Sequence, residues 1–250
     1  MAVFAFALAT STALKVASLD LCADEYLLLF ARDTQVAAVS RLSRDPAESP
    51  LWQRARRFPS YGGRAESLLG VKPTVVLSVG SPGAKSTQVF ARRLGWKSVV
   101  LPYPATPAQV AANVATVGAL LGAGAKADAW AARLSILRRT VPSAVPTLFL
   151  SGGGLSVDPT GLSAQWMALA GFRQLPVPGG KVRLERLAVH PPAALLLSDY
   201  RSGQMSLGQR WLDHPLVRAS TSIKIHTDGR PWTCAGPLML NEVMSLRSRR

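Results

Sequence analysis

The chain has 250 residues, a length that allows either one large α/β domain or two lobes of about 110 to 120 residues each. It is 48% hydrophobic and carries 29 Lys and Arg against 14 Asp and Glu, a formal net charge of +15. The basic residues are scattered, and only Arg247, Arg249 and Arg250 are clustered, so the charge favours a diffuse basic surface over a nucleic-acid-binding face.

The first thirteen residues, 1–13, are uncharged and mostly apolar, and they end in the small residues Ser11, Thr12 and Ala13. This pattern is typical of the apolar region and cleavage site of a secretory signal, although the basic residues that usually precede it are absent. The alternative is a strand preceding Leu14. We expect a truncated signal segment over 1–13, and no later apolar run is long enough to span a bilayer.

Short β-rich runs alternate with helical runs in the first half of the chain. Such alternation predicts parallel strands joined by crossover helices. The expected strands are 14–19, 36–40, 74–79 and 98–101, and the expected helices are 24–31, 51–57, 66–71 and 84–94.

The stretch 106–141 predicts two helices in series. Thr106 and Pro107 are typical of a helix start, Gly122 and Gly124 interrupt the pattern, and Pro142 ends it. The buried face is predicted at Val110, Val114, Val117, Leu121, Trp130, Leu134, Leu137 and Val141. The second helix could be a bridge between two halves or an ordinary crossover helix in one sheet.

The same alternation returns after residue 142, with expected strands at 147–151, 193–198 and 222–226 and expected helices at 164–170, 183–189, 207–212 and 238–246. Five residues also recur at a constant offset of 119 positions. They are Arg64, Glu66, Leu68, Pro73 and Leu77, which recur as Arg183, Glu185, Leu187, Pro192 and Leu196. This internal repeat predicts two homologous lobes, 14–122 and 143–250, joined by a bridging helix at 123–142.

The sequence gives little support for catalysis. His190, His214 and His226 are not spaced with other metal ligands, and no Gly-x-Ser-x-Gly motif occurs. The glycine-rich loops 80–87 and 152–154 lack the spacings of phosphate-binding motifs. We therefore assign no catalytic residue, no metal site and no cofactor.

Loops that follow parallel strands meet at one edge of each sheet, where ligands usually bind. If the two sheets face each other, these loops line a common cleft that carries aromatic rings and guanidinium groups, which suit a flat, partly anionic ligand. The candidate ligand-binding residues are Arg41, Tyr61, Arg64, Tyr200, Arg230 and Trp232, with Arg44 and Arg201 nearby.

From about Leu14 to Leu246 the chain resembles the periplasmic binding proteins with a rigid helical backbone, the receptors of ABC importers for cobalamin, haem and ferric siderophores. The segments that carry the resemblance are 16–25, 36–40, 66–78 and 230–237. The resemblance implies an α/β fold of two similar lobes with parallel-rich sheets, a single bridging helix and a ligand cleft between the lobes.

The same resemblance implies a monomeric, non-enzymatic protein of the periplasm. It would bind a metal chelate, a ferric siderophore or a cobalamin-like corrinoid, and deliver it to the permease dimer. By this resemblance Glu66 and Glu185 are the residues that dock on the permease, and their equivalence in the repeat favours this role over that of a helix-terminal Glu stabilised by the dipole.

Two points stay open. A bilobed transferase acting on an anionic sugar or nucleotide is the alternative, and Asp20, Asp158 and Asp199 are the carboxylates it would use. Cys22 and Cys234 follow the first and last strands, one in each lobe, and could pair in an oxidising compartment. We expect free thiols near the ligand, because loops on opposite walls of a cleft can exceed the ~7 Å between Cα atoms that a disulfide allows.

Overall fold

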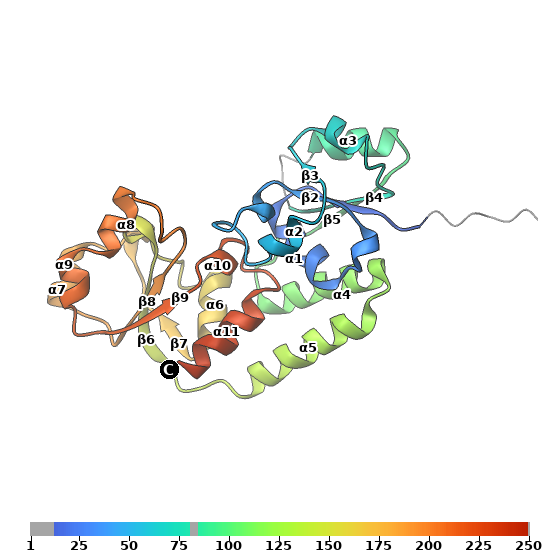
Figure 1. The fold of residues 1–250 in the computed structure, drawn as a ribbon. Coiled ribbons are helices and arrows are strands. Elements are labelled where there is room, and N and C mark those ends of the chain that lie inside the picture. The colour runs from blue at the N-terminus through green and yellow to red at the C-terminus, as the bar shows by residue number, and fades with distance from the viewer. Residues whose placement is uncertain (1–12, 81–84, 250) are drawn as a thin grey trace, which may run out of the picture.

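The structure, a computed structural model of the chain, describes residues 13–80 and 85–249 (Figure 1). The expected signal segment therefore lies outside the described residues except for Ala13. Two parallel sheets with helices packed around them form two α/β lobes, which confirms the predicted fold class. We call them the first lobe, built on the sheet of residues 16–101, and the second lobe, built on the sheet of residues 145–227.

The first lobe contains a five-stranded parallel sheet in the order β3-β2-β1-β4-β5. Three of its strands are buried along their whole length, which is typical of parallel strands covered on both faces. The strands are β1 (Val16–Ser18), β2 (Val36–Ser40), β3 (Ser60–Tyr61), β4 (Val75–Val79) and β5 (Lys97–Leu101). The helices are α1 (Leu21–Phe30), α2 (Trp52–Ala55) and α3 (Lys85–Arg93), with 3₁₀ turns η1 (Asp33–Gln35), η2 (Leu42–Arg44) and η3 (Ala65–Leu68).

The second lobe repeats this plan with a four-stranded parallel sheet in the order β7-β6-β8-β9. This order matches β2-β1-β4-β5 of the first lobe, and β4 and β8 are the strands related by the 119-residue offset. Leu77 and Leu196 are fully buried at equivalent positions in these two strands. The strands are β6 (Val145–Leu150), β7 (Phe172–Gln174), β8 (Ala194–Ser198) and β9 (Ile223–Thr227). The helices are α6 (Leu162–Leu169), α7 (Leu184–Val189), α8 (Leu207–Leu212), α9 (Pro215–Ala219), α10 (Arg230–Cys234) and α11 (Met239–Ser248).

The connection between the sheets is a helical hairpin of α4 (Pro107–Leu121) and α5 (Gly124–Arg139), seen along the lower edge of Figure 1. The Thr106 hydroxyl caps α4, and Gly122 ends it in the left-handed conformation at φ 62°. The two helices approach closely where Gly118 faces Ala127, because a Cβ on Gly118 would lie 2.6 Å from the Ala127 Cβ.

Helix α5 is shorter than the predicted bridging helix. It ends at Arg139, and Val141, which was expected on the buried stripe, has an exposed fraction of 48%. Pro142 restricts the preceding residue to extended backbone, so the helix stops before it. With 16 residues α5 is about 24 Å long at ~1.5 Å per residue, and it packs against α4. The Trp130 indole N–H donates to the Pro237 carbonyl at 3.0 Å.

The short elements β3, β7, α9 and α10 are not among those that the sequence predicts. The two strands have two and three residues, too few for an alternating pattern to be recognised. Helix α10 forms between Gly229 and Gly236 with Pro231 in its first turn, where a missing backbone N–H costs no hydrogen bond. Among the described residues, none of the helices is long and apolar enough to cross a membrane.

Candidate functional site

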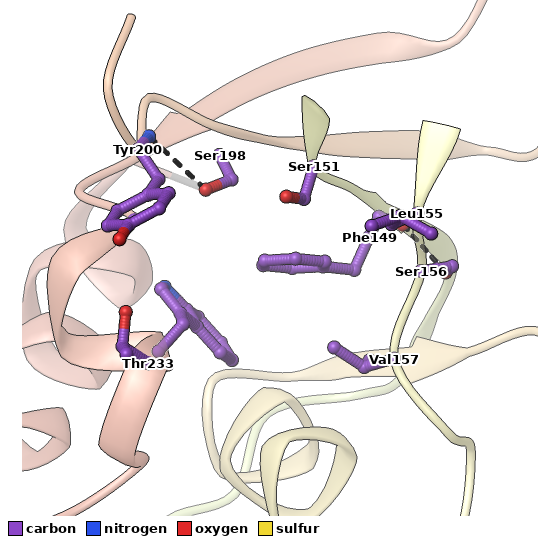
Figure 2. Close-up of a pocket in the computed structure, with 10 residues that line it drawn as sticks. Phe149, Ser151, Leu155, Ser156, Val157, Ser198, Tyr200 and Thr233 are labelled. Carbon is purple, nitrogen blue, oxygen red and sulfur yellow. Dashed lines mark hydrogen bonds between the residues drawn. The ribbon is translucent and has the colours of Figure 1, made fainter. Parts of the chain in front are cut away.

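A cavity of about 280 Å³ lies at the carboxyl ends of β6, β8 and β9 (Figure 2). Parallel sheets commonly bind ligands at this edge. Aromatic rings and small hydroxyl residues line the cavity. They are Phe149, Ser151, Leu155, Ser156, Val157, Ser198, Tyr200, Gly229, Trp232 and Thr233. We call this the aromatic cavity, and two of the predicted ligand-binding residues, Tyr200 and Trp232, belong to it.

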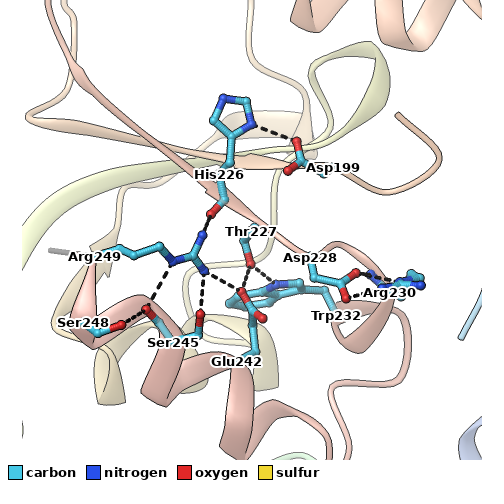
Figure 3. Close-up of polar contacts among 10 residues, drawn as sticks. All are labelled: Asp199, His226, Thr227, Asp228, Arg230, Trp232, Glu242, Ser245, Ser248 and Arg249. Atoms are coloured by element: carbon cyan, nitrogen blue, oxygen red, sulfur yellow. Dashed lines mark hydrogen bonds and ion pairs between the residues drawn. The ribbon is translucent and has the colours of Figure 1, made fainter. Parts of the chain in front are cut away.

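Trp232 is held in place by contacts on both its ring and its indole nitrogen. Its ring centroid lies 5.0 Å from that of Phe149 with a tilt of 50°. The indole N–H donates to the Thr227 hydroxyl at 2.8 Å, and this hydroxyl donates to the buried Glu242 carboxylate at 2.5 Å (Figure 3). Arg249 pairs with Glu242 at 3.4 Å, so a chain of polar contacts from α11 fixes the aromatic wall.

A glycine allows the loop after β9 to approach the loop after β8. A Cβ on Gly229 would lie 2.2 Å from the Ser198 hydroxyl oxygen and 2.4 Å from the Tyr200 Cβ, so no larger residue fits. The Ser198 hydroxyl also accepts a hydrogen bond from the Tyr200 backbone N–H at 3.3 Å. The position of Tyr200 at the cavity edge therefore follows from backbone packing.

The side chain of Tyr200 connects the cavity to the first lobe. Its hydroxyl donates to the carboxylate of Glu48 at 2.7 Å, and burial raises the pKa of Tyr200 above its ordinary value. Arg201 forms an ion pair with the same carboxylate, and its guanidinium lies 5.6 Å from the centroid of the Tyr200 ring. The aromatic cavity thus lies beside the contact between the two lobes.

Arg230 belongs to a neighbouring cavity of about 450 Å³, which we call the polar cavity. A hydrogen bond to Asp228 raises the pKa of Arg230, and the two side chains form an ion pair at 2.7 Å (Figure 3). Arg230 also donates to the Pro46 carbonyl of the first lobe at 2.9 Å. The polar cavity is lined by residues of both lobes, namely Pro46, Ala47, Asp199, Arg201, Ser202, Gly203, Gln204, Asp228 and Arg230.

The remaining predicted ligand residues lie elsewhere. Tyr61 is only 5% exposed, and its hydroxyl is hydrogen-bonded to the buried Thr87 at 2.7 Å, so its ring belongs to the core of the first lobe. Arg64 is exposed and lines a surface hollow of about 510 Å³ together with Glu66. Arg41 is exposed at the start of η2, directly after β2. The structure does not bring these three side chains into the aromatic cavity.

The two predicted docking residues have similar surroundings in the two lobes. Glu66 is exposed at the hollow that Phe90 also lines. Glu185 is exposed at a hollow of about 650 Å³ that Trp211 also lines. Each carboxylate lies two residues after an arginine, in the first turn of a short helix, as the repeat predicts.

The structure contradicts the prediction made for the two cysteines. Cys22 and Cys234 form a disulfide, with Cα atoms 5.3 Å apart, and the expected free thiols are wrong. We expected the two residues to lie on loops on opposite walls of the ligand cleft, too far apart to pair. Instead Cys22 lies in α1 and Cys234 ends α10, and the chain after α10 packs against α1. A Cβ on Gly236 would lie 2.6 Å from the carboxylate of Glu25, which shows how close these segments are.

Two buried carboxyl groups on α1 were also missed. Burial raises the pKa of Asp24 to about 7, although hydrogen bonds from Ser40 oppose the shift. The Ser40 backbone N–H donates to Asp24 at 3.0 Å, and the Ser40 hydroxyl contacts the same carboxyl group. Burial likewise raises the pKa of Glu25 well above its ordinary value. The sequence feature that could have predicted their burial is the position of these two acidic residues within the otherwise mostly apolar segment 21–30.

The carboxylates required by the transferase alternative are engaged in local contacts. Asp20 caps α1 by accepting from the Ala23 N–H at 2.8 Å and also accepts from the Val79 N–H at 3.0 Å. Asp158 accepts from the Thr160 backbone at 2.8 Å, and Asp199 contacts His226 at 2.8 Å. Among the described ranges, no group of three His, Cys, Asp or Glu side chains could hold a metal ion.

The sequence matches no protein-family model. A search of curated proteins finds no match either. Solved structures do match. RhuT of Roseiflexus sp. RS-1, a periplasmic haem-binding protein, is 19% identical with a TM-score of 0.70 over 95% of this chain and 97% of that chain. A periplasmic haem-binding protein from Pseudomonas aeruginosa is 18% identical with a TM-score of 0.65 over 94% and 91% of the two chains.

The periplasmic vitamin B12-binding protein BtuF of Vibrio cholerae is also similar, with 16% identity and a TM-score of 0.65 over 94% of this chain and 95% of that chain. These neighbours agree with the resemblance seen in the sequence. At such identities the likeness establishes the fold, and the chain has the bilobed fold of the periplasmic binding proteins for haem and vitamin B12 that it resembles.

Proposed function

We propose that this chain is the substrate-binding component of an ABC importer, which binds a metal chelate at the aromatic cavity and delivers it to the permease. The observation that carries the proposal is the cavity itself, a hollow at the carboxyl ends of parallel strands walled by Trp232, Phe149 and Tyr200, beside the lobe contact. Aromatic walls suit a flat ring system. The location in the periplasm and the absence of catalysis belong to the same proposal.

The ligand class follows from the site and from the neighbours. Several of the solved structures that resemble this chain are haem-binding or vitamin B12-binding proteins, and both ligands are metal-bearing macrocycles. A corrinoid or a haem would present a flat ring to Trp232, and Arg230 would face its anionic groups. A ferric siderophore is the third chelate of this class and would use the same basic side chains.

Two exposed carboxylates support delivery to a permease dimer. Glu66 and Glu185 occupy equivalent positions in the two lobes, so a partner with two equivalent subunits could contact both at once. A monomer of this chain would then dock across the two subunits. We also propose Arg41 and Arg64 as ligand contacts from the first lobe, because they lie on the loops that follow β2 and β3.

The test is a titration of the purified, ligand-free protein with haem, with cyanocobalamin and with a ferric hydroxamate siderophore. Absorption of the chelate and quenching of tryptophan fluorescence report binding. We expect one chelate to bind with a Kd of about 1 μM or tighter. Failure of all three chelates to bind at tens of micromolar, about tenfold weaker than this limit, would overturn the proposal. The absorption spectrum of protein purified from its native host is the complementary measurement.

A further inference from the structure

Glu48 is a buried carboxylate whose side chain contacts the opposite lobe. It is 4% exposed, and one oxygen accepts from the Tyr200 hydroxyl at 2.7 Å while the other pairs with the Arg201 guanidinium. A buried carboxylate is tolerated only when charged or polar groups compensate for its lost hydration. Here two side chains of the second lobe do so for a residue of the first.

The loop that carries Glu48 has a defined shape. The Asp45 carboxylate accepts from the Ala47 N–H at 2.8 Å. The Asp45 carbonyl accepts from the backbone N–H groups of Glu48 and Ser49, each at 3.1 Å. Pro46 in the same loop accepts a hydrogen bond from Arg230. The turn therefore presents the Glu48 carboxylate to the second lobe at the boundary of the aromatic and polar cavities.

The partners of Glu48 are arranged independently of it. The Tyr200 carbonyl accepts from the Gln209 side chain at 2.9 Å, and Gly229 packs against the Tyr200 backbone. Arg201 has a left-handed backbone with φ 55° and places its guanidinium beside the Tyr200 ring. A phenol hydroxyl and a guanidinium that converge on one point form a donor set for a carboxylate.

We propose that Tyr200 and Arg201 form a carboxylate-binding subsite, which Glu48 fills in the ligand-free protein and which a carboxylate of the bound ligand fills after displacing Glu48. The part that concerns the ligand rests on the proposed function. Tyr200 lines the aromatic cavity and Arg201 lines the polar cavity, so a ligand that extends from one into the other passes the position of Glu48.

Two physical arguments support the exchange. When one carboxylate replaces another, Arg201 stays paired, whereas a ligand without a carboxylate leaves either Arg201 or Glu48 without its partner. The aromatic cavity also has a volume of only about 280 Å³, which is below the roughly 300 to 1,000 Å³ of sites for drug-sized ligands. Withdrawal of the Glu48 loop enlarges the site, and the subsite thereby selects chelates that carry peripheral carboxylates.

The first experiment tests the subsite without any chelate. In the variant Glu48→Ala the subsite is vacant, and propionate should occupy it. We expect about 50 mM propionate to raise the Tm of Glu48→Ala by about 2 °C or more, with no such rise for propionamide or for the wild type. Asp213→Ala, which removes an exposed carboxylate paired with Arg218, is the matched control and should not respond.

The rise in Tm with propionate, which we call propionate rescue, should disappear when Arg201→Gln is added to Glu48→Ala. An equal response of wild type, Asp213→Ala and Glu48→Ala to propionate would overturn the subsite, because it would be a general salt effect. The absence of any response in Glu48→Ala would overturn it as well.

The second experiment uses the variant Glu48→Gln, which keeps the shape of the side chain and removes its charge. The probes are iron protoporphyrin, with two free carboxylates, and its dimethyl ester. We expect wild type to bind the acid about fivefold or more tightly than the ester, and Arg201→Gln to lose this preference. Glu48→Gln should bind the acid more tightly than wild type, because the internal competitor is gone.

The two experiments separate the two proposals. Equal binding of acid and ester by wild type, with no propionate rescue, would reject the subsite and leave the proposed function standing. Propionate rescue in a protein that binds neither porphyrin, nor the chelates tested above, would reject the proposed function and support the subsite.

Discussion

Cys22 of α1 and Cys234 of α10 join the two lobes through a disulfide between residues 212 positions apart in the chain. Cys234 lies two residues after Trp232, so this bond ties one wall of the aromatic cavity to the first helix of the opposite lobe. Together with α5, it gives the lobes two connections, one covalent and one helical. We expect the relative motion of the lobes to be small near the disulfide and larger at the Glu48 loop.

Removal of the disulfide should destabilise the protein. For Cys22→Ser with Cys234→Ser, we expect the free energy of unfolding to fall by about 2 to 5 kcal/mol, because the unfolded chain regains the freedom of a long closed loop. Urea unfolding of the double variant against wild type measures this change. Wild type in reducing buffer should match the double variant, and thiol counting on unfolded, unreduced wild type should find no reactive thiol.

Trp232 should contribute directly to chelate binding. For Trp232→Ala we expect the Kd to rise about fivefold or more, since a stacked aromatic wall contributes about 1 kcal/mol beyond the buried area. Trp52→Ala is the control, because Trp52 packs under Arg56 in the first lobe and lines neither cavity. If both variants keep the wild-type Kd in a fluorescence-independent titration, such as calorimetry, Trp232 has no role in the ligand site.

The orientation of Trp232 should depend on Thr227. Thr227→Val keeps the volume of the side chain but removes the hydroxyl that links the indole to Glu242. We expect weaker binding, about threefold or more, together with a loss of stability of about 1 to 3 kcal/mol, because buried polar groups lose their partner. Thr116→Val, at an exposed position of α4, should change neither quantity.

Charge reversal at the two docking residues should separate transport from binding. Glu66→Lys combined with Glu185→Lys should abolish uptake in cells that carry the cognate permease, because like charges would then repel the partner surface. The Kd for the chelate should stay within about twofold of wild type, since a change below ~0.4 kcal/mol is expected at sites remote from the cavity. Asp128→Lys combined with Asp213→Lys, at two other exposed carboxylates, is the charge-matched control. Normal uptake by the Glu66 and Glu185 double variant would exclude the docking role.

The buried Asp24 should make stability depend on pH. Its pKa is about 7 in the folded protein and 3.8 in its ordinary state, so between these values the folded state holds a proton that the unfolded state has lost. Stability therefore falls as pH rises from about 4 to about 7, by up to roughly 4 kcal/mol, and this contribution is constant above that window.

Asp24→Asn should flatten the dependence, because an amide does not titrate. Urea unfolding at pH 4.5, 6 and 7.5 measures the slope for wild type and variant. Glu25 shifts in the same direction, so part of the slope should persist in Asp24→Asn and disappear in Asp24→Asn with Glu25→Gln. An unchanged slope in the double variant would show that other groups control it, and Asp213→Asn should keep the wild-type slope.

The fold class and the approximate positions of most strands and helices could be predicted from the order of the amino acids. Buried strands such as β4 and β8 are continuous apolar runs, and α4 has its cap, its stripe and its terminal glycine within one short segment. These signals depend on residues that are close in the chain. The 119-residue repeat further predicted that the two lobes are equivalent, because segments with the same residue pattern form the same local contacts.

Contacts between side chains that are distant in the chain could be identified only in the folded protein. The Cys22–Cys234 bond, the contact of Glu48 with Tyr200 across 152 positions and the burial of Tyr61 against Thr87 depend on the relative placement of separate segments. Local patterns assign a residue to a loop or helix but do not fix the distance between two loops. That distance follows from how α1, α10 and the Glu48 loop pack at the lobe contact, where burial and charge pairing together select one arrangement.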